Sequence, residues 1–224
     1  MTGLLQPEDL TGDQLHLVRG GARLSGGRTD IVFSTREPEH QRRILARLAQ
    51  VDDLDALRLF MSLPLQYPVS VDALSAEQRT ILRRVPAGSV TLSGAFATRV
   101  LDHAVDVRAV VVRSPRWRPG LRLAGRFLGA APTVLILPSS AHVPPTEIWE
   151  AAVTGVGVWV DEPDGLHELV PVGRFRPEVI KPAMWRFEER AYGAWLRSGP
   201  EPPVGSGACE RRYASGSEGS YRTR

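Results

Sequence analysis

The chain has 224 residues, of which 42% are hydrophobic, and this is enough apolar material for one large globular domain or two small ones. The formal net charge of +3 is too small to indicate a strong overall field for nucleic acid, although Lys181 is the only lysine among the 28 basic residues. A single cysteine, Cys209, excludes an intrachain disulfide framework or a cysteine-based zinc site and fits a cytoplasmic protein. No membrane span or signal peptide is expected, because no apolar run reaches about 18 residues.

The first region, residues 1–85, is predicted to contain a β-hairpin followed by short helices. Two short apolar runs around Gly-Gly turns predict strands, and three amphipathic stretches predict helices. These elements are expected at residues 16–19, 30–34, 37–50, 52–63 and 75–84. Asp52 or Asp53 is the expected cap of the second helix, and Ser75 opens a capping-box pattern for the third. Three short helices fit a helix-turn-helix-like DNA reader, although helices that cover a sheet or form a dimerisation lobe are more common.

The second region, residues 86–196, changes to alternating strands and helices. Its first three strands follow one another closely along the chain, which predicts an antiparallel meander. They are expected at residues 89–94, 95–101 and 105–113. The later elements are expected as helix 118–128, strand 133–137, helix 146–155, strands 156–161 and 166–172, and helix 181–196. This order predicts an α/β fold in which a mixed β-sheet is flanked by helices.

The stretch from residue 105 to residue 138 carries the clearest fold signal. A nearly continuous apolar run predicts a strand that is buried on both faces, and an amphipathic helix and a second apolar run follow it. Strand, helix and strand with short connections predict a parallel crossover. On the helix, Arg118, Arg122 and Arg126 are four residues apart and share the side opposite the apolar residues. That side is either a solvated helix face or a surface that contacts phosphate.

The last region, residues 197–224, contains Gly, Ser, Pro and charged residues with few apolar side chains. This composition cannot bury enough apolar surface to offset the entropy of ordering the chain. We therefore expect a disordered C-terminal tail.

Three segments of the central region resemble a known group of enzymes. They read VVVRSPRWRPGLRLAGRF, APTVLILP and EAAVTGVGVWV. The first resembles an acidic-X-Lys strand end followed by a Trp and an Ala-rich helix, the second a strand that ends in Pro, and the third a turn of small residues. These features are similar to those of the PD-(D/E)XK, or restriction-endonuclease-like, superfamily. The resemblance covers residues 88–172 and implies a nuclease-like core within residues 86–196.

The resemblance also implies that the catalytic residues have been replaced. The family needs two carboxylates and a lysine around Mg²⁺, which neutralises the phosphate charge and generates the nucleophile. Where the acidic-X-Lys pattern should stand, this chain has Val111, Val112 and Arg113. A valine offers no oxygen ligand to Mg²⁺, and an arginine does not exchange its proton at neutral pH. We therefore expect no catalytic residue, no metal ligand and no cofactor.

The leading hypothesis is a catalytically degenerate protein of the nuclease fold that binds DNA, or a regulatory partner, through an arginine-rich edge. The residues expected to contact nucleic acid are Arg113, Arg116, Arg118, Arg122 and Arg126.

Two alternatives remain open at this point. One is an active Mg²⁺-dependent endonuclease with rearranged ligands, and its candidate residues are Asp102 or Asp106, Glu150 and Lys181. The other is a protein–protein interaction module without nucleic acid, possible also as a homodimer. Its candidate interface residues are Trp149, Trp159 and Trp185, for which packing in the core is the default expectation.

Overall fold

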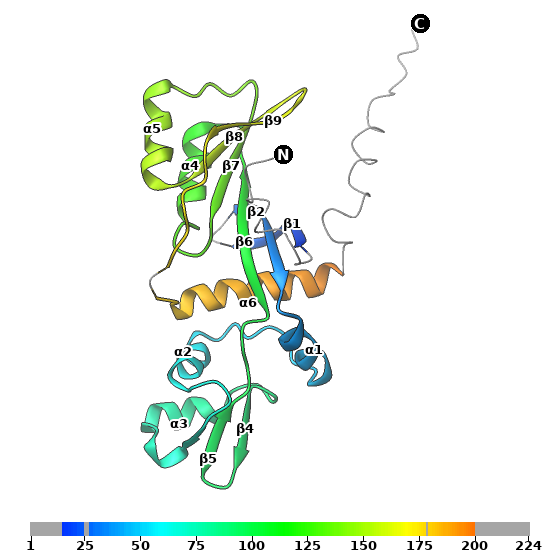
Figure 1. Ribbon diagram of the computed structural model, residues 1–224, viewed down its shortest axis with the longest axis vertical. Helices are drawn as coiled ribbons and strands as arrows, with labels where there is room; N and C mark the ends of the chain where they lie inside the picture. The colour runs from blue at the N-terminus through cyan, green and yellow to red at the C-terminus, as the bar shows by residue number, and fades with distance from the viewer. Residues whose placement is uncertain (1–14, 25–26, 178, 200–224) are drawn as a thin grey trace, which may run out of the picture.

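The computed structural model describes residues 15–24, 27–177 and 179–199, which form two β-sheets and six α-helices (Figure 1). Along the chain, the elements are β1 (Leu15–Leu24), β2 (Gly27–Thr35), α1 (Glu37–Leu45), α2 (Leu54–Ser62), β3 (Pro68–Ser70), a 3-10 turn (Val71–Ala73), α3 (Ala76–Leu82), β4 (Val90–Ser93), β5 (Phe96–Arg99), β6 (Val105–Arg113), α4 (Trp117–Gly125), β7 (Thr133–Pro138), α5 (Pro145–Thr154), β8 (Gly157–Glu162), β9 (Gly165–Val170) and α6 (Pro182–Ser198). The residues of the predicted C-terminal tail from 200 onward lie outside the described ranges.

The larger sheet has six strands in the order β1-β2-β6-β7-β8-β9. Strands β6, β7 and β8 are parallel, and the other pairs are antiparallel, so the predicted mixed sheet is confirmed. The predicted crossover is also confirmed, because β6 pairs in parallel with β7 and α4 connects them, with Val111 opposite Val134. The apolar run of β6 has this position because Val110 and Val112 are fully buried under one face and Val111 under the other.

The predicted antiparallel meander is wrong. Strands β4 and β5 pair with each other, but β5 then pairs with β3 in a separate three-stranded sheet, whose order is β3-β5-β4. Strand β6 instead pairs with β2, where Ile31 lies opposite Val110. The physical reason is burial: β6 needs cover on both faces, whereas the second sheet is small and β4 is mostly exposed. Closeness along the chain therefore did not decide the partner of β6.

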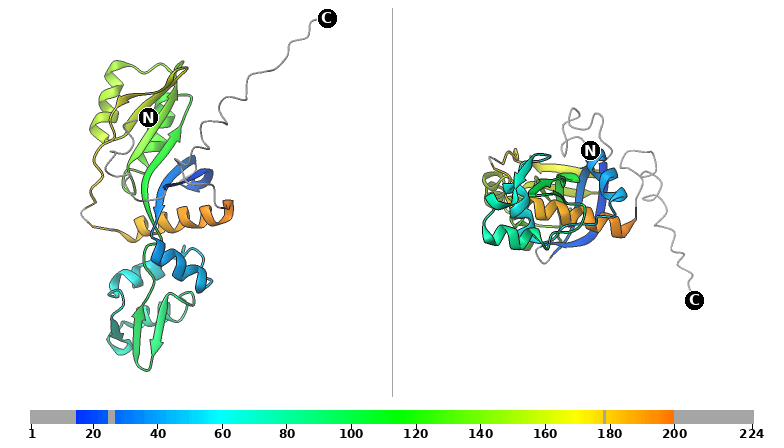
Figure 2. Two further views of the ribbon diagram at one scale, coloured as in Figure 1. Left: turned by 45° about the vertical axis from the view of Figure 1, so that its right-hand side comes forward. Right: turned by 90° about the horizontal axis from the view of Figure 1, so that it is seen from below.

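Elements α2 to β5 (residues 54–99) form a small lobe beside the larger sheet (Figures 1 and 2). Its helices begin where the sequence predicts. The Asp53 carboxylate accepts a hydrogen bond from the Asp55 backbone N–H at 2.9 Å, and Ser75 and Gln78 form a complete capping box. The hairpin β1–β2, which the sequence placed in the same region as these helices, belongs to the larger sheet.

Helix α6 lies between the larger sheet and the small lobe (Figure 2). Trp185 packs in the core of the lobe with Leu57 and Phe60, whereas Tyr192 and Trp195 pack under the sheet. These three aromatic side chains are thus buried, whereas Leu196 near the end of the helix is 42% exposed. Within the described ranges, no helix has both the length and the apolar character that crossing a membrane requires.

A buried ionic network connects α6 to α1 and to the segment between β5 and β6, which contains Asp102. The fully buried guanidinium of Arg43 donates to the Glu39 carboxylate at 2.8 Å and to both oxygens of Glu189 at 2.7 and 2.8 Å. It also donates to the Asp102 carbonyl at 2.6 Å. Glu189 accepts further hydrogen bonds from the Val51 N–H and the Trp185 indole. The network fixes α6 at the junction of the two parts.

Candidate functional site

The predicted arginine row lies on the solvent side of α4. Trp117, Leu121 and Ala124 are buried against the sheet, and Arg118 and Arg122 are exposed, as the helical spacing predicts. The helix sits close to the sheet because position 120 is a glycine. A Cβ at Gly120 would come within 2.6 Å of the Leu135 side chain.

At the N-terminal end of α4, acidic neighbours partly neutralise the arginines. Arg113 ends β6 and is half exposed, and its guanidinium lies 3.8 Å from the Asp30 carboxylate and 3.7 Å from that of Asp161. Arg118 donates to Glu147, which extends from α5. Arg116 occupies the N-cap position of α4 without a side-chain capping bond, and it is exposed. The structure therefore brings Arg113, Arg116 and Arg118 to one end of the helix, where two of the three have acidic partners.

At the C-terminal end of α4, the row leads into a pocket of about 440 Å³. The pocket lies where the end of α4 meets the start of α6, and its lining combines cationic side chains with an apolar floor. The lining residues are Leu54, Arg126, Phe127, Gly129, Ala130, Lys181, Ala183, Met184, Arg186, Phe187 and Arg190. We call this the basic pocket.

Asp52 fixes two of the arginines at the basic pocket. Its Oδ1 accepts from the Nε of both Arg186 and Arg190 at 2.7 Å, and its Oδ2 accepts from Arg190 Nη2 at 3.2 Å. Partial burial raises the pKa of Asp52, but the hydrogen bonds from Arg190 and Arg186 outweigh this effect and hold the pKa below its usual value. The carboxylate is therefore ionised at neutral pH. Four cationic side chains line the pocket, and the Asp52 carboxylate pairs with two of them.

Sequence reasoning missed the contribution of α6 to this site. Arg186 and Arg190 are four residues apart on one helix, which is the same signal that singled out the arginines of α4. Their link to Asp52 spans more than 130 residues and has no sequence signature. Lys181 was considered only as a catalytic candidate, and it instead lines the basic pocket.

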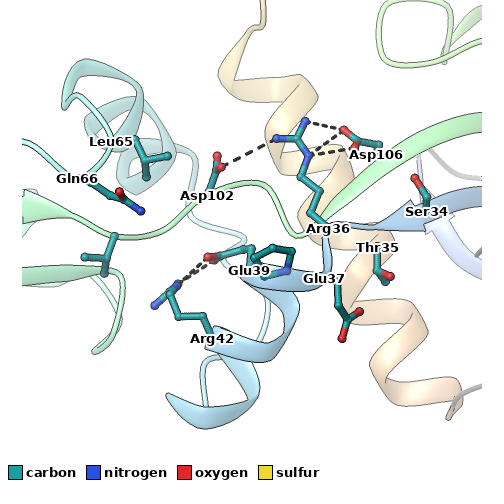
Figure 3. Close-up of a pocket in the computed structure, with 12 residues that line it drawn as sticks. Ser34, Thr35, Arg36, Glu37, Glu39, Arg42, Leu65, Gln66, Asp102 and Asp106 are labelled. Carbon is teal, nitrogen blue, oxygen red and sulfur yellow. Dashed lines mark hydrogen bonds and ion pairs between the residues drawn. The ribbon is translucent and has the colours of Figure 1, made fainter. Parts of the chain in front are cut away.

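The carboxylates of the nuclease alternative lie elsewhere. Asp102 and Asp106 line a different pocket, of about 560 Å³, between the larger sheet and the small lobe (Figure 3). The Arg36 guanidinium lies between them, with Nη2 2.6 Å from Asp106 and Nη1 4.0 Å from Asp102 (Figure 3). This guanidinium already supplies the positive charge that a metal ion would bring. Glu150 is exposed on α5, so the structure does not unite these acidic residues and Lys181 in one site.

A second ionisable pair lies beside this carboxylate pocket. The His103 ring stacks on Trp185 at a centroid distance of 4.4 Å and forms a short hydrogen bond with Glu188. Burial raises the pKa of Glu188, and the hydrogen bond from His103 offsets this only in part. The pair joins the segment before β6 to α6, and it contributes no side chain to the lining of the carboxylate pocket.

A metal ion has few places to bind in the described ranges. There, one group of three acidic or histidine side chains is close enough to share an ion, and it comprises Glu162, Asp164 and His167. All three are exposed at the β8–β9 turn. The hydrogen bond between Asp164 and His167 lowers the pKa of Asp164 and raises that of His167, as expected for a surface ion pair.

The three tryptophans of the interaction alternative have different surroundings. Trp159 is buried against Val134 and Ile136 on the face of the sheet away from α4, and Trp185 is buried in the lobe core. Trp149 is 74% exposed on α5, one turn from Val153, which is 76% exposed. Of the three, only Trp149 presents an apolar surface to solvent.

Comparison of the chain with protein-family models, with curated proteins and with solved structures finds no match. The relationship to the PD-(D/E)XK superfamily therefore remains a proposal that depends on the sequence motifs.

Proposed function

We propose that this protein binds DNA without cleaving it, as a degenerate relative of the PD-(D/E)XK nucleases. The binding surface is the basic face, which comprises Arg113, Arg116, Arg118, Arg122 and Arg126 beside and on α4, and Lys181, Arg186 and Arg190 on α6. The observation that carries the proposal is the continuity of this face: an exposed arginine row leads into a pocket that contains three further cations.

The dimensions of the row fit a phosphate backbone. Arg118 and Arg126 are eight residues apart, which on an α-helix is about 12 Å. Successive phosphates of one B-DNA strand advance by about 3.4 Å along the axis, so the row can follow three or four of them. Arginine suits this role because its planar fork can donate two parallel hydrogen bonds to one phosphate.

The proposed function includes no cleavage of DNA because of the residues at the end of β6. Val111 packs with Val134 and Ile136 on the face of the sheet away from α4. An apolar side chain therefore occupies the position at which the family has a metal-binding carboxylate. An arginine such as Arg113 is a poor general base and cannot take the place of the family's lysine in activating water. Phosphate contacts of this kind give affinity and register but little sequence specificity.

The test measures binding of a fluorescently labelled DNA duplex by anisotropy at about 50 to 200 mM salt. Each phosphate contact is expected to add about −0.9 to the slope of log K against log salt, and Arg122→Ala to remove about one unit of slope. Arg83→Ala is the matched control, because Arg83 is also exposed at the end of a helix but lies in the small lobe. No binding by the wild-type protein at the lowest salt refutes the proposal, as do equal effects of the two variants.

A protein partner is the second candidate, and the exposed pair Trp149 and Val153 on α5 favours it. An apolar surface this exposed on one helix turn is typical of an interaction site. Light scattering over a range of protein concentrations tests self-association, and the double variant Trp149→Ser, Val153→Ser is expected to abolish it. A concentration-independent monomer rules out the homodimer.

A further inference from the structure

We infer that the basic pocket binds a terminal phosphate together with the nucleoside that carries it. The protein would then recognise the phosphorylated end of a nucleic-acid strand, or the same group on a free nucleoside monophosphate. For the strand end, this inference rests on the proposed function; the nucleotide chemistry of the pocket stands on its own observations.

The charge of the pocket matches a phosphomonoester better than an internal phosphodiester. Arg126 reaches it from the end of α4, and Lys181, Arg186 and Arg190 reach it from α6. An internal phosphate carries one negative charge, whereas a terminal phosphate carries about −1.5 to −2 at pH 7 and offers three acceptor oxygens. A concave site lined by four cationic side chains favours the more highly charged group.

The cations of α6 are held in place before any ligand arrives. Asp52 accepts from Arg186 through Nε alone and from Arg190 through Nε and Nη2. Its carboxylate therefore orients both guanidinium groups, which lowers the entropy lost when a ligand binds. The pocket also lies at the first turn of α6, a helix of 17 residues whose N-terminal dipole favours an anion.

The shape of the pocket selects a chain end. Its volume of about 440 Å³ falls within the ~300–1,000 Å³ of small-molecule sites, and a duplex cannot enter it. Leu54, Phe127, Met184 and Phe187 supply an apolar floor, and the two phenylalanine rings are 5.9 Å apart. This floor can receive the flat apolar surface of a base while the cations hold the phosphate.

The experiment compares four probes by calorimetry with the full chain: a single-stranded oligonucleotide with a 5′-phosphate, the same oligonucleotide with a 5′-hydroxyl, adenosine monophosphate and inorganic phosphate. The phosphorylated oligonucleotide is expected to bind at least about tenfold more tightly than its hydroxyl form. Competition by adenosine monophosphate, but not by equal inorganic phosphate, supports the requirement for the nucleoside.

Variants separate this inference from the proposed function. Lys181→Gln and Arg186→Gln are each expected to remove the preference for the 5′-phosphate, and Arg122→Gln to weaken both oligonucleotides equally. Thermal melting checks that each variant folds, and the two pocket substitutions serve as independent tests. Equal affinity for the two oligonucleotides refutes the strand-end inference and leaves the proposed function standing. Binding of adenosine monophosphate with no binding of either oligonucleotide refutes the strand-end inference but supports a nucleotide site. If none of the four probes binds, the inference is wrong, and the duplex titration decides the proposed function separately.

Discussion

The buried network around Arg43 allows a prediction of large magnitude. Replacement of Arg43 by Met removes four hydrogen bonds and leaves the Glu189 carboxylate, which is 1% exposed, without the cation that it pairs with. Glu39, in contrast, keeps its ion pair with Arg42. Burial alone lowers the pKa of Arg43, but its hydrogen bonds to Glu189 and Glu39 outweigh this and raise the pKa, so the guanidinium stays protonated. Removal of one partner of such a buried pair costs about 3–5 kcal/mol of unfolding free energy.

For a chain of this length, each kcal/mol lowers the melting temperature by about 2–4 °C, so Arg43→Met is expected to lower it by about 6–20 °C. Calorimetry and urea unfolding both measure the change. Arg58→Met is the control, because Arg58 forms an equally short ion pair with Asp55 but both side chains are more than half exposed, and it should cost under about 1 kcal/mol.

A second substitution tests whether the orphaned charge causes the loss. In Arg43→Met, Glu189→Gln, the amide oxygen can still accept from one of the two donors, the Val51 N–H or the Trp185 indole, which bind different carboxylate oxygens, and no buried negative charge remains at that position. The double variant is therefore expected to recover part of the stability that the single variant loses. A loss below about 1 kcal/mol in Arg43→Met, or no recovery in the double variant, would show that this reasoning is wrong.

Two further predictions concern α4 and Asp52. Gly120→Ala is expected to destabilise the protein by about 1–3 kcal/mol, because the added methyl group would contact Leu135 too closely. Gly125→Ala in the same helix has open space around the new methyl group and should stabilise the protein by up to about 1 kcal/mol. Thermal melting measures both changes, and the melting temperature should fall in the first variant and rise in the second. The folded-state pKa of Asp52 is lowered, so its stabilisation is complete above the unfolded-state pKa near 4 and is lost as the pH falls through the folded value. Asp52→Asn should therefore flatten the acid side of the stability profile measured by urea unfolding.

The sequence was most informative where local chemistry decides the structure. The apolar run of β6 and the helical spacing of α4 predict the parallel crossover correctly, because both depend on residues a few positions apart. Asp53 and Ser75 cap their helices for the same reason. The predicted first helix was too long, since α1 ends at Leu45 and Arg47 turns the chain with a positive φ of 51°.

The partners of β6 and the full extent of the basic face depend on contacts between distant residues. Strand β2 lies more than 70 residues before β6 in the chain, and periodicity alone cannot distinguish it from the nearer β5 as a partner. Likewise, the arginine row of α4 was predicted, but its extension into the basic pocket requires α6 to lie beside the end of α4. That position depends on tertiary packing along α6, where Trp185 packs in the lobe core and Tyr192, two turns later, packs under the larger sheet.

The same helix therefore links stability to the proposed binding site. Trp185 and Glu189 form one stripe of α6, which faces the buried network, and Arg186 and Arg190 form the adjacent stripe, about 100° around the helix, at the basic pocket. A helix packed this closely shifts as a unit, so a change that displaces Glu189 also displaces the two arginines that Asp52 orients. The buried pair Trp185 and Glu189 and the partly exposed pair Arg186 and Arg190 are thus held by the same helix. This explains how a charged group with no exposure, Arg43, can fix the geometry of cations that lie at the surface.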